Sequence, residues 1–261
     1  MIYLKQVHIH SETFPVPDLY PFGLKLFQNT KHLEFNRGIT FFIGENGTGK
    51  STLLRALAHR CGIHIWENEF YLRVEENPYE ADLYKHLSIQ WSKDPVPGSY
   101  FGSQIFSHFA KNLEEWSLND PAMLDYFGGK SLITQSHGQS LMSYFRSRYR
   151  IKGLYFLDEP ETALSPSSLI DLLNLLIRIN QLGHAQFIIA THSPFLMACP
   201  DSRIYSFDNQ IIAPIPYEQT DHYNLYKNFM DNPANFIKSF PQMRAGTINL
   251  FQPNKRRRYE D

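Results

Sequence analysis

A glycine-rich loop at residues 44–51 has the residue types and the spacing that bind a polyphosphate. It follows an apolar run at 38–43 and precedes a helix-like run at 52–61, the strand, loop and helix order that the motif requires. Glycines let successive amide hydrogens point inward, and the helix N-terminus adds to that positive field. We expect Lys50 to reach the β- and γ-phosphates of a nucleotide and Ser51 to hold Mg²⁺. The residues expected to contact the nucleotide are Gly44, Asn46, Gly47, Thr48, Gly49, Lys50, Ser51 and Thr52.

Two carboxylates end a second apolar run, at residues 154–157. Four apolar residues followed by Asp158 and Glu159 form a Walker B pattern, in which Asp158 holds Mg²⁺ through water and Glu159 polarises the water that attacks the γ-phosphate. Ser165 and Pro166 then have the residue types of a helix N-cap and first helical residue. The sequence predicts a helix that ends at Gly183 and buries a stripe of Leu169, Ile170, Leu172, Leu173, Leu176 and Ile177.

A third apolar run, residues 186–190, leads into Thr191-His192-Ser193. With these motifs in this order over residues 44–193, the chain resembles an ABC-type ATPase of the SMC and RecF branch. It is most similar to the small stand-alone bacterial ATPases of the AAA family. The resemblance implies an α/β P-loop NTPase fold, with an ABC-type core of mixed sheet flanked by helices and a small helical subdomain. It also implies that ATP and Mg²⁺ are bound and that ATP is hydrolysed.

Further roles come from the same resemblance. Ser136, His137, Gly138 and Gln139 resemble the signature motif, which contacts the γ-phosphate bound to the opposite subunit, although His137 stands where the family usually has glycine. That motif implies an ATP-dependent homodimer. His192 matches the switch histidine that senses the γ-phosphate, so Glu159, His192 and Lys50 are the expected catalytic residues. The expected dimer-contact loop contains Ala163, Leu164 and Ser165, and its Leu-Ser-Pro sequence resembles the RecF-like branch more than the transporters.

Two assignments stay open at this stage. The glutamine that contacts water and Mg²⁺ in the family is Gln104, which follows Tyr100-Phe101, or Gln90 in the alternating run 86–91. We take Gln104 as the third metal-site residue, with Ser51 and Asp158. An adenine-stacking aromatic is expected near the N-terminus, but the pattern does not distinguish Tyr20, Phe22, Phe27 and Phe35.

The remaining sequence predicts how the chain is organised. We expect one ATPase domain over residues 1–240, with a protein-specific and helical subdomain region at 63–135, and a polar basic tail at 241–261. Residues 1–10 alternate like a strand. A hairpin is expected from 203–207 and 211–213, stopped by Pro214, and a helix near 224–240.

Composition limits the partners and the compartment. The net charge of −1 lacks the excess of basic residues typical of a dedicated DNA-binding domain, so DNA stays a possible partner through the resemblance alone, as does a protein. The two cysteines have no metal or disulfide spacing, and no apolar run is long enough to span a bilayer, so we expect a cytoplasmic protein without membrane insertion. Two other functions stay open, an ATP-gated dimerisation switch with negligible turnover and the nucleotide-binding subunit of a transporter.

Overall fold

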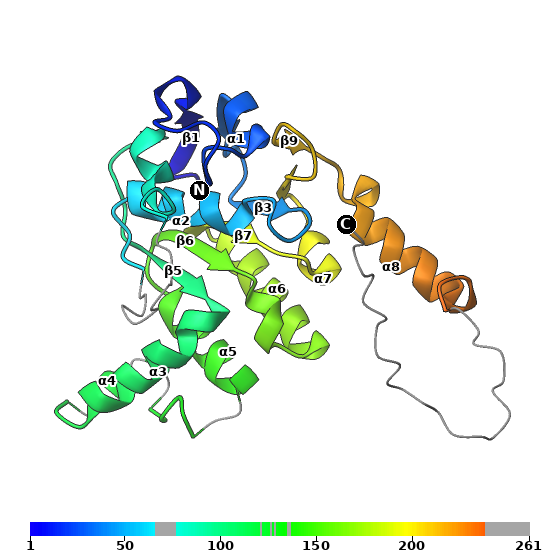
Figure 1. The fold of residues 1–261 in the computed structure, drawn as a ribbon. Coiled ribbons are helices and arrows are strands. Elements are labelled where there is room, and N and C mark those ends of the chain that lie inside the picture. Colours follow the sequence, from blue (N-terminus) through cyan, green and yellow to red (C-terminus); the bar gives the residue numbers. More distant parts are fainter. Residues whose placement is uncertain (66–76, 121, 126, 128, 135–136, 238–261) are drawn as a thin grey trace, which may run out of the picture. The chain divides into compact units, whose positions relative to one another are not determined.

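The computed structural model describes residues 1–65, 77–120, 122–125, 127, 129–134 and 137–237 (Figure 1). The chain divides into two compact units, Met1–Asn224 and Leu225–Asp261. The first unit contains every predicted motif. None of the helices in the described ranges is both long and apolar enough to cross a membrane.

A six-stranded sheet forms the centre of the first unit. Its strand order is β5 (Gly98–Gly102), β6 (Gly153–Asp158), β7 (Ala185–Ala190), β3 (Ile39–Ile43), β8 (Arg203–Ser206) and β9 (Ala213–Pro214). The first five strands are parallel, and β9 is antiparallel to β8. The three strands predicted from apolar runs are confirmed as β3, β6 and β7. These strands consist of continuous apolar residues because helices cover one face of the six-stranded sheet, and helices with a second sheet cover the other.

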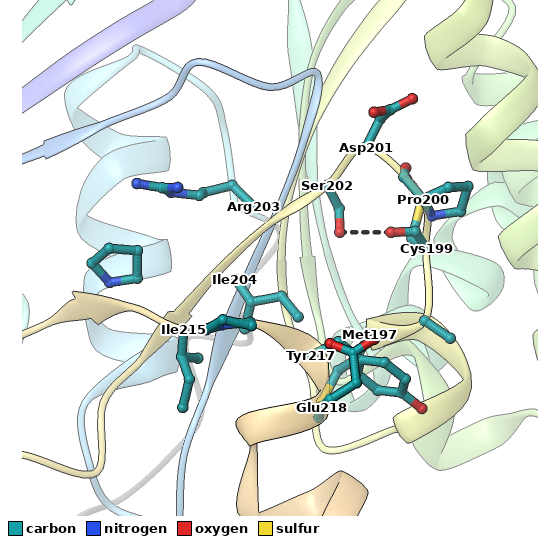
Figure 2. A pocket seen from close by; sticks show the side chains of 13 residues that line it. Met197, Cys199, Pro200, Asp201, Ser202, Arg203, Ile204, Ile215, Tyr217 and Glu218 are labelled. Carbon is teal, nitrogen blue, oxygen red and sulfur yellow. Dashed lines mark hydrogen bonds between the residues drawn. The ribbon is translucent and has the colours of Figure 1, made fainter.

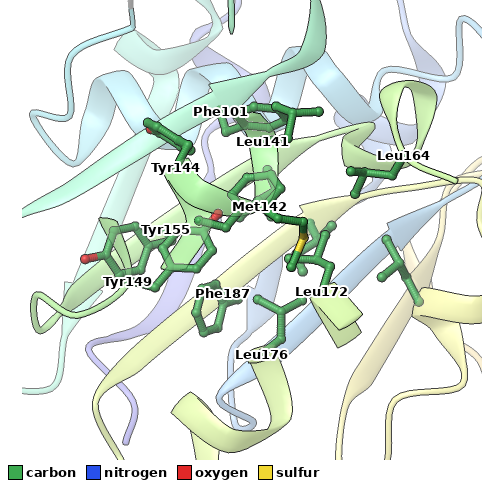
Figure 3. Close-up of a cluster of buried hydrophobic side chains, with 14 of the residues drawn as sticks. Phe101, Leu141, Met142, Tyr144, Tyr149, Tyr155, Leu164, Leu172, Leu176 and Phe187 are labelled. Carbon is green, nitrogen blue, oxygen red and sulfur yellow. The ribbon is translucent and has the colours of Figure 1, made fainter. Parts of the chain in front are cut away.

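Alternate side chains of each central strand enter two separate cores. Phe41, Tyr155 and Phe187 point into a core with α3 (Ser103–Ser117), α5 (His137–Arg148) and α6 (Pro166–Gln181). Figure 3 shows Tyr155 and Phe187 beside Leu172 and Leu176 of α6 in this core. On the other face, Phe42 and Phe156 pack with α1 (Lys25–Asn29), α2 (Lys50–Arg60) and a small antiparallel sheet. That sheet has the order β2 (His32–Glu34), β1 (Leu4–Ile9) and β4 (Leu87–Trp91).

The helix α6 begins as its sequence predicts. Ser165 is its N-cap, and its Oγ accepts a hydrogen bond from the Ser168 amide at 3.2 Å. Leu169, Leu172 and Leu176 are buried in the core. Ile170 was expected in the same stripe but is 46% exposed, because it lies on the opposite side of the helix from the sheet.

Short helices complete the first unit. They are η1 (Ser11–Thr13), η2 (Asp82–His86), α4 (Ala122–Asp125), η3 (Pro160–Ala163), α7 (Pro194–Met197) and η4 (Tyr217–Gln219). The region 63–135 therefore supplies β4, β5, α3 and α4 among its described residues, so it contributes a strand to each sheet as well as helices. The boundary predicted at residue 240 stays a prediction.

Two elements after residue 200 differ from their predicted bounds. The hairpin forms, but its second strand is Ala213–Pro214 and not 211–213, because Pro214 pairs with Tyr205 at the edge of the sheet, where a missing N–H is tolerated. The helix predicted near 224–240 is α8 (Asp221–Asp231), which starts earlier because Thr220 caps it and ends before Pro233. A turn, η5 (Pro233–Asn235), follows, and residues 238–240 of the predicted helix lie outside the described ranges.

Candidate nucleotide site

The phosphate loop connects β3 to α2, and its glycines adopt conformations that other residues rarely adopt. Gly44 and Gly49 have φ angles of 144° and 98°. A Cβ atom on Gly49 would also lie 2.9 Å from side-chain carbons of Leu24 and Phe27. Position 49 thus requires glycine for its backbone conformation and for its packing against α1. The loop passes directly into α2, so the helix N-terminus faces the space where phosphates are expected.

Lys50 lies within this loop rather than in solvent. Its Nζ donates hydrogen bonds of 2.7 Å to the carbonyl oxygens of both Gly44 and Glu45. Burial lowers the pKa of Lys50, and the nearby carboxylates of Glu159, Asp208 and Asp158 oppose that shift. The ammonium group is therefore held by the loop, where a polyphosphate would replace these neutral carbonyl acceptors with negatively charged oxygens.

Thr48 and Asn46 complete the turn of the phosphate loop. Thr48 Oγ1 donates to the Glu45 carbonyl at 2.9 Å, which closes the turn, and the Asn46 side chain is exposed. The Glu45 amide donates to Asp208 Oδ1 at 2.7 Å. Asp208 follows β8, between the two segments of the predicted hairpin, so its contact with the loop depends on β8 lying beside β3.

Ser51 and Asp158, two residues of the predicted metal site, are in direct contact. Ser51 Oγ donates to Asp158 Oδ1 at 2.7 Å, and Tyr100 OH donates to Asp158 Oδ2 at 2.8 Å. A hydroxyl and a carboxylate are the hard oxygen ligands that suit Mg²⁺, which keeps several waters and needs few protein ligands. Among the residues that the structure describes, no cluster of three or more His, Cys, Asp or Glu side chains is placed to hold a metal.

Tyr100 was missed as a site residue. Burial, followed by the charge of Asp158, raises the pKa of Tyr100 well above its usual range, so the hydroxyl stays protonated and can only donate to that carboxylate. Its signal in the sequence was a tyrosine inside an otherwise apolar strand, because a buried hydroxyl requires a partner.

Glu159 has a backbone conformation that marks a constrained position. Its φ and ψ are 46° and 55°, in the left-handed region that a glutamate rarely occupies. Its amide donates to the Ala190 carbonyl at 2.9 Å, and its carbonyl accepts from Thr162 Oγ1 at 3.0 Å. Burial raises the pKa of Glu159, with a further contribution from Asp158. A carboxylate with a raised pKa is a better proton acceptor from water.

His192 lies beside Glu159. Its Nε2 is 3.8 Å from Glu159 Oε1, and its backbone amide donates to Glu161 Oε1 at 2.5 Å. Burial lowers the pKa of His192 to about 4, with smaller contributions from the positive charge of Lys50 and from His222. The imidazole is therefore neutral near pH 7, and one of its nitrogens can donate a hydrogen bond while the other accepts one. Glu161, which the sequence did not mark as a site residue, holds the His192 backbone through this bond.

The strand order explains why these groups converge. β7 lies between β3 and β6, so His192 emerges between the phosphate loop that follows β3 and the carboxylates that follow β6. All three segments leave the carboxyl ends of parallel strands, where open α/β sheets bind ligands. The structure thus brings Lys50, Ser51, Asp158, Glu159 and His192 to one edge of the sheet.

The described part of the signature motif lies at the start of α5, whereas the phosphate loop leads into α2. Ser136 and the side chain of His137 are outside the described part of the chain, and His137 is the first residue of α5. A Cβ on Gly138 would lie 3.8 Å from Ser168 Oγ and 4.0 Å from the Ala163 carbonyl, and Gln139 is exposed. Gly138 of the signature motif and the expected dimer-contact loop, Ala163, Leu164 and Ser165, are therefore neighbours within one subunit.

The two candidates for the glutamine at the metal site, Gln104 and Gln90, lie in different parts of the fold. Gln104 is the second residue of α3, directly after β5, whose last residue Gly102 pairs with Asp158. Gln90 lies in β4 and pairs with Gln6 in the small antiparallel sheet. The backbone of Gln104 is thus near the carboxyl end of β6, and its side chain is outside the described atoms.

The four aromatic candidates for stacking on adenine differ in their exposure to solvent. Phe22, Phe27 and Phe35 are at most 1% exposed, whereas Tyr20 is 41% exposed. The hydroxyl of Tyr20 is hydrogen-bonded to Thr52 Oγ1 in the first turn of α2, and its carbonyl accepts from Asn77 Nδ2 at 2.7 Å. Of these four aromatic side chains, only Tyr20 is exposed.

A surface cleft of about 510 Å³ lies away from this site (Figure 2). Residues 197–204 and 214–218 line it, and Ser202 Oγ donates to the Cys199 carbonyl within it at 2.8 Å. The cleft is at Arg203, which begins β8 and pairs with Thr40, whereas the phosphate loop follows Ile43 at the other end of the same strand pair. The cleft is therefore separate from the predicted nucleotide site.

Comparisons with known proteins agree with this geometry. A family model described as "AAA domain" matches residues 22–59, and one described as "AAA domain, putative AbiEii toxin, Type IV TA system" matches residues 141–198. The first segment contains the phosphate loop, and the second contains the Asp158-Glu159 pair and His192.

Two curated bacterial proteins are similar over most of the chain. The "Probable siderophore transport system ATP-binding protein YusV" of Bacillus subtilis is 26% identical over 194 residues, which covers 64% of this chain and 69% of that protein. The "Petrobactin import ATP-binding protein FpuD" of Bacillus anthracis is 25% identical over 213 residues, covering 74% and 76%.

The fold is similar to that of a solved structure. CbiO1 of Clostridium perfringens, part of the ABC transporter complex CbiONQ, superposes with a TM-score of 0.52 at 17% identity. The match covers 89% of this chain and 97% of CbiO1. The two chains share a fold.

Proposed function

We propose that this ABC-type P-loop ATPase closes as a homodimer around two ATP molecules and reopens when it hydrolyses them. The convergence of Lys50, the Ser51–Asp158 pair, Glu159 and His192 at one edge of the sheet carries the proposal. Support for the dimer comes from the signature helix α5, whose Gly138 lies next to Ala163 of the expected dimer-contact loop.

The reaction would use the groups as follows. The loop amides and Lys50 hold the phosphates, while Ser51, Asp158 and Gln104 would hold Mg²⁺, which neutralises phosphate charge when bound. Glu159 accepts a proton from the attacking water, whose oxygen bonds to the γ-phosphorus as the bond from that phosphorus to the β,γ-bridging oxygen breaks. The products are ADP and phosphate. Neutral His192 donates a hydrogen bond toward the γ-phosphate and Glu159, and Ser136 with the Gly138 amide would complete the site from the partner subunit.

What the cycle drives is a separate question. The Leu164-Ser165-Pro166 sequence supports the SMC/RecF-like branch, and with it a cycle that acts on nucleic acid or regulates a protein partner. Within the described residues, Arg148 at the end of α5 donates to the Gly98 carbonyl at 2.9 Å, so that basic side chain has a structural role. The basic tail lies outside the described part of the chain. The expected cytoplasmic location stays a prediction.

A second candidate follows from the comparisons. YusV and FpuD are ATP-binding proteins of transport systems, so the chain is also a candidate for the nucleotide-binding subunit of a transporter. This alternative would require a membrane-spanning partner, and co-purification with one would favour it over the SMC/RecF-like reading.

Steady-state phosphate release tests the proposal. We expect turnover per subunit to rise with protein concentration, because each site needs a second subunit, and to be absent in Lys50→Ala. Parallel reactions contain double-stranded DNA, single-stranded DNA or RNA. Stimulation by one of them would identify the partner class, and no effect of any would favour a protein partner. ATP-dependent dimerisation without turnover would instead support the dimerisation switch.

Tyr20 is proposed as the adenine-stacking residue, and its replacement gives a binding prediction. In Tyr20→Ala we expect KM for ATP to rise by about 5- to 100-fold, since stacking of one base on an aromatic ring contributes about 1–3 kcal/mol. Tyr20→Phe keeps the ring but loses the hydrogen bond to Thr52, so its KM should change much less. Equal KM values for Tyr20→Ala and the wild type, measured by phosphate release, would exclude stacking on Tyr20.

A further inference from the structure

A second histidine contacts the ring of His192. His222 Nε2 lies 3.2 Å from His192 Nδ1, within hydrogen-bond distance, and the two ring centroids are 5.4 Å apart. Both residues belong to the first compact unit. The other nitrogens of the pair, His192 Nε2 and His222 Nδ1, are buried and have no hydrogen-bond partner among the described residues. The two rings are therefore in direct contact, and His192 is the one that lies beside Glu159.

Several contacts fix His222 in this position. It lies in the first turn of α8, whose N-cap Thr220 is fully buried and accepts a hydrogen bond at Oγ1 from the Tyr223 amide at 3.2 Å. The ring of Tyr223 packs against Tyr217 with centroids 4.8 Å apart. Tyr217 OH donates to the Pro194 carbonyl at 3.1 Å, two residues after His192. The start of α8 is thus tied to the segment that carries the switch histidine.

The hydrogen bond between the rings determines which nitrogen of His192 carries its proton. Both rings share a single contact, so one nitrogen must donate and the other must accept. Either arrangement leaves one buried N–H without a hydrogen bond, at His222 Nδ1 or at His192 Nε2. If His192 Nδ1 donates, the lone pair of His192 Nε2 faces the Glu159 carboxylate 3.8 Å away, which repels it. If His222 Nε2 donates, His222 Nδ1 carries the lone pair, and the N–H of His192 Nε2 points toward the Glu159 carboxylate, which attracts it. The second arrangement leaves the proton of His192 on Nε2, which faces Glu159.

We propose that His222 is a positioning residue for ATP hydrolysis, which orients the His192 ring and holds it as the Nε2–H tautomer by donating to Nδ1. This inference rests on the proposed function. In this form His192 presents a donor to the γ-phosphate and to Glu159. In the other tautomer it would present a lone pair to a negatively charged phosphate, and the sensing contact would be lost.

Kinetics of His222 variants test the role in hydrolysis. We expect His222→Phe, which keeps a ring of similar size, to lower kcat by roughly 10- to 100-fold with KM for ATP within about twofold, because the lost hydrogen bond serves a catalytic donor and not ground-state binding. His222→Gln, which keeps an N–H donor, should recover part of the loss. His8→Phe is the matched control, since His8 is exposed on β1, and it should behave as wild type.

A double-mutant cycle separates positioning from general destabilisation. If His222 acts through His192, the double variant His192→Ala/His222→Phe should turn over no more slowly than His192→Ala alone. Independent, multiplicative losses would overturn the proposal, as would wild-type kcat in a folded His222→Phe protein. Thermal unfolding of each variant confirms that it is folded.

A measurement without turnover tests the tautomer itself. Long-range ¹H–¹⁵N spectra of histidine-labelled protein report which ring nitrogen carries the proton, and His192→Ala assigns the signal of His192. We expect His192 to be protonated at Nε2 in the wild type and to populate both tautomers in His222→Phe. A wild-type ring protonated at Nδ1 would overturn the inference even if the protein hydrolyses ATP. An Nε2–H ring in a protein without turnover would contradict only the proposed function.

Discussion

Glu159→Gln is expected to lower kcat for ATP hydrolysis by about 10²- to 10⁴-fold, the usual contribution of a general base. The amide has nearly the same shape as the carboxylate but cannot accept a proton from water. The backbone contacts of Glu159 with Ala190 and Thr162 do not involve the side chain, so the substitution should leave its position unchanged. We therefore expect ATP to bind and remain bound, which filter binding with labelled ATP measures beside phosphate release.

Stability gives an independent check on the same variant. Burial raises the pKa of Glu159, so the charged carboxylate is disfavoured in the folded protein above that pKa, and a neutral amide should not lower the unfolding temperature. Glu34→Gln is the matched control, because Glu34 is exposed on β2 in the small sheet and the same chemical change there should not affect kcat. A Glu159→Gln protein that turns over within about tenfold of the wild type would assign the base to another group.

The second large effect is expected from mixing two inactive proteins. Lys50→Ala removes the lysine from the phosphate loop, and Gly138→Asp places a carboxylate where the γ-phosphate of the partner subunit would bind. Each variant alone should lose about 10²-fold or more of its turnover, the usual cost of one stabilising donor in a phosphate or oxyanion site. In an equal mixture, about half of the dimers are mixed and each has one site with an intact lysine and an intact signature, so about a quarter of the wild-type rate should return.

The geometry around Gly138 makes this test specific. A Cβ there meets its nearest neighbours at 3.8–4.0 Å, an ordinary contact distance, so a side chain fits within its own subunit. An aspartate near the N-terminus of α5 is also compatible with the helix dipole. Gly138→Ala, which adds no charge, is the matched control and should keep more activity than Gly138→Asp. If the mixture stays inactive while both proteins are folded and dimeric, the signature does not act across the interface.

Most of the central fold could be predicted from the sequence. Both faces of the parallel sheet are covered, so its central strands are continuous apolar runs, at residues 38–43, 154–157 and 186–190. Such a run can be recognised within each strand by itself. The start of α6 was equally clear, since Ser165 and Pro166 act locally on the first turn. The position of β9 was missed because Pro214 is tolerated in a strand only at the edge of the sheet. The bounds of α8 were missed because its start depends on capping by Thr220 and its end on Pro233.

The candidate site was predictable to the extent that its residues lie in contiguous motifs. Lys50, Ser51, Asp158, Glu159 and His192 each follow an apolar strand. Gln104 and Gln90 could not be separated, because the choice depends on whether β4 or β5 pairs beside β6. Tyr20 could not be separated from three phenylalanines, because burial by α2 and the small sheet is a property of packing and not of residue type.

The sequence by itself determined the chemical groups, their order and the strands that present them, because glycine conformations, apolar runs and helix caps act over a few neighbouring residues. Only the tertiary structure decided which groups touch. The insertion of β7 between β3 and β6 places His192 beside Glu159, and the contacts of Tyr100 with Asp158, of Asp208 with the loop and of His222 with His192 join residues far apart in the chain. Such contacts depend on the packing of whole elements, and no local pattern of residues encodes them.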